Sequence, residues 1–292
     1  MQTTNIAFLL KECESARRSK SWSALERCSL QVLTLAETVN MPEKSLIETI
    51  KNYLSSILGS GEFISDFNMK SLAHFENGVK NLQFFLEKKP HLHNEVRTLE
   101  RAANEVRLLS LNPTASNQNK IARSLRTLAR PDLSIQIGES LLLLSKKNYY
   151  VLTTLCAAYC DNYEFDKAIK SAEIALKYNP IDGQSFALNA LTRAYTERFK
   201  RDGEITDIER ALELANQSLE RKVDIFSANS YIAAAVASGR EDEIESANNI
   251  LEKVNPATSI VDEEALIAAY EAASTIPDEI MQDYLNSRPL PK

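Results

Sequence analysis

The chain has 292 residues, with 34 lysines and arginines against 40 aspartates and glutamates, which gives a formal net charge of −6. A chain of this length buries enough apolar surface to be stable without a disulfide or a metal. It contains only 7 glycines and 9 prolines, a balance that favours helices over strands with their turns.

The N-terminus has an apolar run of only five residues with no basic stretch before it. We therefore expect neither a signal peptide nor a membrane span. Four cysteines, Cys13, Cys28, Cys156 and Cys160, lie in helical patterns and form no CxxC pair. This usage is typical of reduced thiols packed in a core, so we expect a cytoplasmic protein that does not interact with membranes.

Apolar residues recur at three- and four-residue spacing along nearly the whole chain, which predicts an all-α fold. Pro42, Pro131 and Pro277 suit the first turn of a helix, and Asp262 suits a helix N-cap. The predicted helices are 4–18, 21–39, 43–58, 66–88, 92–110, 118–129, 132–146, 149–161, 165–178, 184–199, 206–221, 225–237, 241–253, 262–274 and 278–286.

Residues 148–180 carry the most specific pattern. Apolar and small residues stand at fixed intervals over two helices and end in a proline: Leu152, Leu155, Cys156, Tyr159, Ala168, Ala172, Ala175 and Pro180. The segment resembles a tetratricopeptide repeat, whose 34-residue pattern places residues of these kinds at this spacing. Leucine replaces the family's tryptophan and cysteine replaces its glycine.

The resemblance extends more weakly over residues 118–290, because the helices at 184–221 and 225–253 repeat parts of the pattern. It implies an α-solenoid of antiparallel helix pairs, a right-handed superhelix like that of tetratricopeptide proteins, with capping helices at the C-terminus. We therefore expect a solenoid over 113–292. Residues 1–112 fit the pattern poorly and are either divergent repeats or a separate helical bundle.

The resemblance also implies a function, since the family binds partners along the first helix of each pair. We therefore expect a non-catalytic scaffold or adaptor that holds a protein or peptide partner in a concave groove. The repeat spacing assigns the partner-binding positions to Arg126, Arg130, Tyr150, Thr153, Phe186, Asn189, Arg193, Phe226 and Asn229. Thr153 stands where chaperone-binding members have a lysine, which disfavours a chaperone adaptor.

Basic residues gather in the middle of the chain, where residues 86–147 hold eleven lysines and arginines against six acidic residues. Lys120, Arg123, Arg126 and Arg130 are spaced so that one face of a helix would carry them all. This stripe supports an alternative in which the protein is a nucleic-acid-associated regulator that uses the basic middle helices.

A second alternative is a helical enzyme, or an enzyme regulator, that acts through residues 1–112. No serine or cysteine stands in a nucleophile motif, and the chain has no glycine-rich phosphate loop. His91 and His93 follow Pro90 and would need further ligands from elsewhere to bind a metal. We therefore expect no enzymatic activity, no cofactor and no metal.

Overall fold

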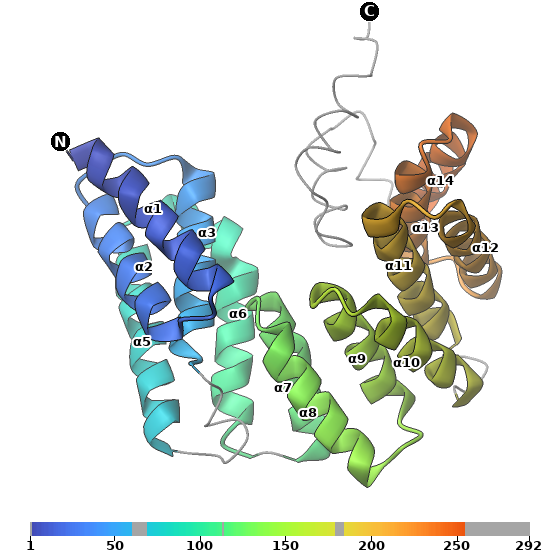
Figure 1. Ribbon diagram of the computed structural model, residues 1–292, viewed down its shortest axis with the longest axis horizontal. Helices are drawn as coiled ribbons and strands as arrows, with labels where there is room; N and C mark the ends of the chain where they lie inside the picture. Colours follow the sequence, from blue (N-terminus) through green and yellow to red (C-terminus); the bar gives the residue numbers. More distant parts are fainter. Residues whose placement is uncertain (1, 60–68, 113, 179–183, 255–292) are drawn as a thin grey trace, which may run out of the picture. The chain divides into compact units, whose positions relative to one another are not determined.

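The computed structural model describes residues 2–59, 69–112, 114–178 and 184–254, and within these ranges the chain forms thirteen α-helices and no strand. Within each of its two units, helices that follow one another along the chain pack together, as in a helical solenoid (Figure 1). The predicted all-α class is thus confirmed. The predicted helices at 262–274 and 278–286, with Asp262 and Pro277, lie outside the described residues.

The chain divides into two compact units, residues 1–146 (unit 1) and 147–292 (unit 2). The predicted division at residue 112, between a helical N-terminal region and a solenoid, stays a prediction. The helices over residues 93–144 lie in one unit, because each packs on the next. Unit 1 contains α1 (Gln2–Arg18), α2 (Trp22–Ala36), α3 (Glu43–Ile57), α5 (Met69–Glu87), a 3-10 turn (Pro90–Leu92), α6 (His93–Leu109), α7 (Ala115–Thr127) and α8 (Pro131–Leu144).

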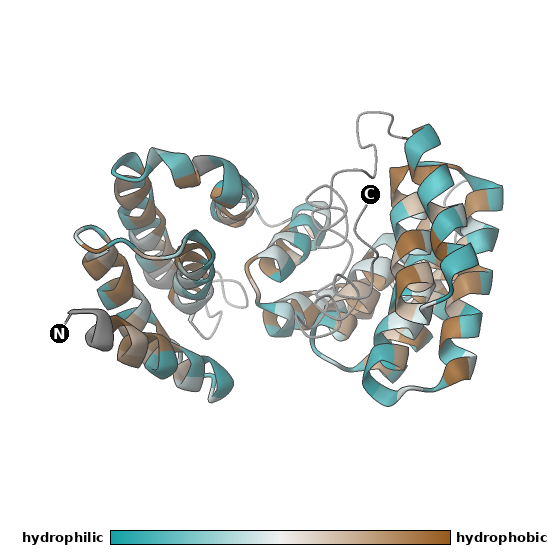
Figure 2. Ribbon diagram, turned by 90° about the horizontal axis from the view of Figure 1, so that it is seen from above, coloured by the Kyte–Doolittle hydropathy of each residue, from teal (hydrophilic) through white to brown (hydrophobic). Residues whose placement is uncertain are grey.

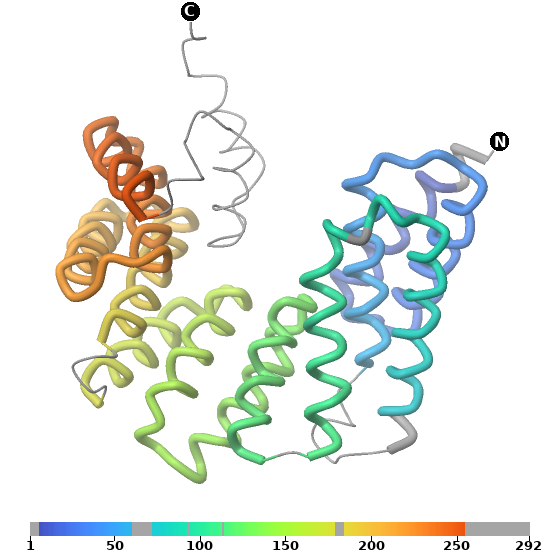
Figure 3. Tube along the Cα trace, turned by 180° about the vertical axis from the view of Figure 1, so that it is seen from behind, coloured from blue at the N-terminus to red at the C-terminus, as the bar shows by residue number. Residues whose placement is uncertain are grey.

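Unit 2 is a run of helices in which each packs on the next (Figure 3). Its helices are α9 (Tyr149–Asp161), α10 (Phe165–Tyr178), α11 (Gln184–Asp202), α12 (Ile205–Arg221), α13 (Ile225–Ser238) and α14 (Glu241–Val254). In addition, α11 packs on both α9 and α13. Helices α9 and α10 begin and end where the sequence predicts, whereas α11 continues past the predicted end at 199.

Local chemistry explains several helix ends. The Asn148 side chain accepts a hydrogen bond from the Val151 amide and caps α9. Asp224 and Ser227 form a reciprocal capping box at the start of α13. Such caps satisfy amides that have no partner inside the helix. Tyr163, with φ of 61°, takes a left-handed conformation that turns the chain between α9 and α10.

Apolar and polar residues alternate in bands along each helix (Figure 2). Where the helices of unit 2 meet, small side chains are fully buried, among them Cys156, Ala168 and Ala175. Small residues at these positions let helix backbones approach closely. The Cys156 thiol lies 3.4 Å from the Ala190 carbonyl oxygen of α11, so α9 and α11 meet at this cysteine.

Unit 1 is packed with larger side chains. Ile50, Leu54, Phe75 and Leu86 are fully buried. Gly78 of α5 lies so close to α3 that a Cβ atom there would stand 2.6 Å from the Ile57 Cδ1 atom. In the described part of the chain, no helix has the length and apolar character needed to cross a membrane.

Candidate functional site

Helices α9, α11 and α13 of unit 2 form one face. Short connections join each helix to the next, so α10 and α12 run antiparallel to their neighbours and the three alternate helices run parallel. Helix α11 packs on both of the others. Three parallel first turns therefore lie at the same end of the face.

An exposed aromatic residue occupies the first turn of each of these helices. Tyr150 is 59% exposed, Phe186 49% and Phe226 62%. We call these three residues the aromatic row. The Tyr149 ring centroid lies 3.9 Å from that of Tyr150, and the hydrogen bond between the two hydroxyls raises the pKa of Tyr149 to about 12.

Three residues further along each helix, a polar side chain follows on the same side: Thr153, Asn189 and Asn229. We call these the polar row; all three are partly exposed. The Asn189 Oδ1 atom accepts a hydrogen bond of 2.7 Å from the Ser218 hydroxyl. The Asn229 Oδ1 atom is buried and finds no hydrogen-bond donor.

Arg193 lies one turn beyond Asn189 on α11 and is already engaged by the protein. Its guanidinium forms an ion pair with Asp161 at the end of α9, while its Nε atom is buried without a partner. Burial alone would lower the pKa of Arg193, but the Asp161 carboxylate raises it above its ordinary value. Arg193 therefore joins α9 to α11, and its charge is balanced within the face.

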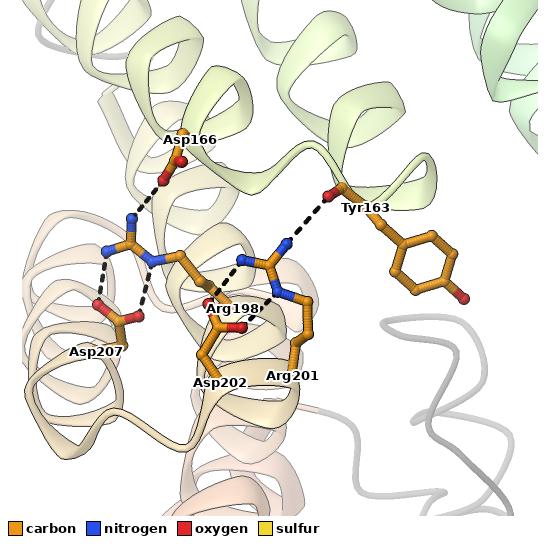
Figure 4. Close-up of polar contacts among 6 residues, drawn as sticks. All are labelled: Tyr163, Asp166, Arg198, Arg201, Asp202 and Asp207. Atoms are coloured by element: carbon orange, nitrogen blue, oxygen red, sulfur yellow. Dashed lines mark hydrogen bonds and ion pairs between the residues drawn. The ribbon is translucent and has the colours of Figure 1, made fainter.

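A second arrangement of charged side chains fixes the far end of α11 (Figure 4). The Arg198 guanidinium donates two hydrogen bonds of 2.7 Å to Asp207 of α12 and one of 2.8 Å to Asp166 of α10. Arg201 bonds Asp202 and donates to the Tyr163 carbonyl oxygen at 3.3 Å. These contacts fix the helix that carries Phe186 and Asn189. Sequence reasoning missed them, because the repeat pattern marks no partner for Arg198 at the predicted helix end or for Arg201 beyond it.

The predicted position of Arg130 in the groove is wrong, because this residue is buried in unit 1. It is 1% exposed, and its guanidinium carbon lies 4.0 Å from the centroid of the Trp22 ring. Its nitrogen atoms donate to both carboxylate oxygens of Asp132, at 2.8 and 2.9 Å, and to the carbonyl oxygens of Ser55 and Gly59, at 3.2 and 2.6 Å. Arg130 thus ties α2 and the end of α3 to the start of α8.

The predicted basic stripe does not reach Arg130, because the helix that carries its other residues ends before that position. Helix α7 ends at Thr127, and Ala129, with φ of 56°, turns the chain before Arg130. Lys120 and Arg123 are exposed and Arg126 is partly exposed. Arg126 belongs to unit 1, so neither predicted arginine of the middle region is part of the face described above.

Three basic side chains lie next to the starts of α9 and α13 or near the end of α10. Lys147 precedes α9, Lys177 lies in the last turn of α10, and Arg221 ends α12; all three are exposed. The Nζ atoms of Lys147 and Lys177 lie 5.0 and 5.9 Å from the Tyr178 ring centroid. We call these three residues the basic edge. Lys222, beside them, forms an ion pair of 3.0 Å with Asp224.

The described residues show little that resembles a reaction centre. No group of three or more His, Cys, Asp or Glu side chains among them lies close enough to hold a metal ion. All four cysteines are buried and outside any disulfide, and burial raises the pKa of the Cys13 thiol to about 12. A thiol with so high a pKa is a poor nucleophile at neutral pH.

Neither the family models nor the curated proteins that were searched contain a match to this chain. The function proposed below therefore rests on the side chains of the face formed by α9, α11 and α13.

Proposed function

We propose that this protein is a non-catalytic scaffold that binds an extended segment of a partner protein on the face formed by α9, α11 and α13. The observation that carries the proposal is the aromatic row, in which Tyr150, Phe186 and Phe226 stand exposed at equivalent places on three neighbouring parallel helices.

Exposed aromatic side chains at regular intervals suit binding. Tyrosine and phenylalanine bury large areas with few rotatable bonds, and aromatic anchors supply much of the binding energy of protein interfaces. The polar row lies beside them, where its amide and hydroxyl groups can bond the backbone of a bound segment and set its position. Arg193 supports the face by joining α9 to α11.

The resemblance of residues 148–180 to a tetratricopeptide repeat supports the same reading. The small residues of that pattern, Cys156, Ala168 and Ala175, are fully buried where helices of unit 2 pack. A right-handed superhelix with a concave groove, as in that family, is part of the proposal. So is a cytoplasmic location, in keeping with four buried cysteines that form no disulfide.

The alternative functions have less support. A nucleic-acid partner on the basic middle helices would draw on Arg130, but that side chain is buried and already holds four oxygen atoms. For an enzyme or enzyme regulator acting through residues 1–112, the described residues of that range show no group of three or more His, Cys, Asp or Glu side chains that could hold a metal ion. The face of unit 2 remains the stronger candidate.

Selection of peptides from a random displayed library by the immobilised full chain tests the proposal. We expect the selected peptides to lose binding to a chain that carries Tyr150→Ala, Phe186→Ala and Phe226→Ala together. The matched control is Phe8→Ala with Phe84→Ala, since these two phenylalanines of unit 1 are each 60% exposed and lie outside the face.

Thermal unfolding of both variants establishes that they remain folded. The selected peptides should bind the control variant as they bind the original chain. If the triple alanine variant keeps its peptides, or if no peptide is selected at all, the face of α9, α11 and α13 is not the binding surface.

A further inference from the structure

We propose that the segment bound on this face is acidic and proline-rich, adopts the polyproline II conformation, and carries a proline or another apolar residue at every third position. The inference rests on the proposed function and names the class of partner.

The spacing of the aromatic row carries the first step. Packed helices lie about 8–10 Å apart, so one ring on each of α9, α11 and α13 gives a repeat of about that length. A polyproline II segment has three residues per turn and rises about 3.1 Å per residue, so it returns to the same side every 9.3 Å or so. A β-strand returns to the same side about every 6.7 Å, which does not match.

The polar row carries the second step and argues against a helical partner. An α-helix satisfies its own backbone groups, whereas a polyproline II segment has no internal hydrogen bonds and needs partners for its carbonyl oxygens and remaining amides. The Asn189 Oδ1 atom is used by Ser218, which leaves its amide nitrogen to donate to a carbonyl oxygen.

The basic edge carries the third step. Lys147, Lys177 and Arg221 are exposed at the same end of unit 2 as the aromatic row, and no carboxylate of the described residues forms an ion pair with them. Charge complementarity therefore selects acidic residues beside the apolar positions of the partner. In this ligand, the apolar residues contact the aromatic row, the backbone bonds to the polar row, and the carboxylates lie against the basic edge.

Fluorescence anisotropy with labelled synthetic peptides and the full chain tests the inference. The first probe is about twelve residues long, enough to span the three helices in a polyproline II conformation, with proline at every third position and glutamates between. The second has the same composition with its prolines in one block. The third is an acidic, alanine-rich helical peptide, and the fourth is an oligodeoxythymidine.

We expect the periodic probe to bind at least about tenfold more tightly than each of the others. Phe186→Ala should weaken its binding about tenfold, whereas Phe8→Ala should leave it unchanged. Lys147→Glu with Arg221→Glu should weaken binding further at low salt than at high salt, because added salt screens charges at the surface.

Three results would overturn the inference: equal binding of the periodic and blocked probes, tighter binding of the helical peptide, or tighter binding of the oligonucleotide. In each case peptides selected from the random library can still depend on the aromatic row, and the proposed function then survives without this ligand class. If Phe186→Ala affects neither the library peptides nor the periodic probe, both proposals fail together.

Discussion

Unit 1 and unit 2 are both runs of helices packed in sequence, but different side chains hold them together. In unit 2, alanines with no exposed surface, including Ala168, Ala211 and Ala228, lie between helices beside larger apolar side chains such as Leu212. In unit 1 the core consists of bulky side chains, and one buried arginine, Arg130, joins parts of the chain more than seventy residues apart. The small residues of unit 2 follow a local pattern that can repeat, whereas unit 1 adds a long-range contact to its apolar core.

The largest effect is expected from breaking that contact. Arg130→Met leaves Asp132 and two helix-end carbonyl oxygens without their donor, and we expect unit 1 to lose about 3 kcal/mol of unfolding free energy. Trp22, the one tryptophan of the chain, lies against Arg130, so its fluorescence during denaturant titration reports on unit 1.

Arg101→Met is the control, since Arg101 is exposed in the same unit. An unchanged transition in Arg130→Met would mean that the arginine is not needed for the packing of unit 1.

A smaller effect is expected from overfilling a small-residue contact in unit 2. Ala168 is fully buried where α10 packs on α9, and Ala168→Phe should cost about 2 kcal/mol because the helices must move apart. Circular dichroism should show this as a lower midpoint, while the Trp22 transition of unit 1 stays the same. Lys170→Phe adds the same ring at an exposed position of α10 and should cost little. Equal midpoints for the two variants would show that α9 and α10 are loosely packed.

The smallest effect on the unfolding free energy is expected from lowering the pH. Burial alone would raise the pKa of Asp132, but its bonds to Arg130 hold that pKa below the ordinary value. The stability gained from the ionised carboxylate is therefore complete above about pH 4 and is lost as the pH falls through the lowered pKa. The unfolding free energy measured through Trp22 should fall as the pH drops below about 4, and it should fall less steeply in Asp132→Asn. Parallel pH profiles for the two proteins would contradict this assignment.

Most of the helices were predictable because their signals are local. Helices α9 and α10 have the predicted ends, where the Asn148 cap and the turn at Tyr163 act within a few residues. Helix α11 was predicted too short, since it continues to Asp202 while Arg198 and Arg201 bond residues of three other segments. Contacts of that kind depend on the folded arrangement and leave no periodic trace in the sequence.

The candidate site was only partly predictable for the same reason. Repeat spacing located Tyr150, Phe186 and Phe226, which are exposed as a binding role requires. It misplaced Arg130, because helical spacing was extended past Thr127, where α7 ends. One signal was present: Pro131 follows Arg130, and a residue before proline is driven out of the helical conformation.

The link between α11 and α12 shows what the Arg198 contacts make possible. Only Gly203 and Glu204 separate the two helices, and both are exposed, so a protease or an engineered break has access there. Across that link, the Arg198 guanidinium of α11 donates two hydrogen bonds to the Asp207 carboxylate of α12. If the chain is cut at this point, the hydrogen bonds between Arg198 and Asp207 still hold α11 and α12 together. The link is therefore a suitable place to divide the protein into two fragments that reassemble.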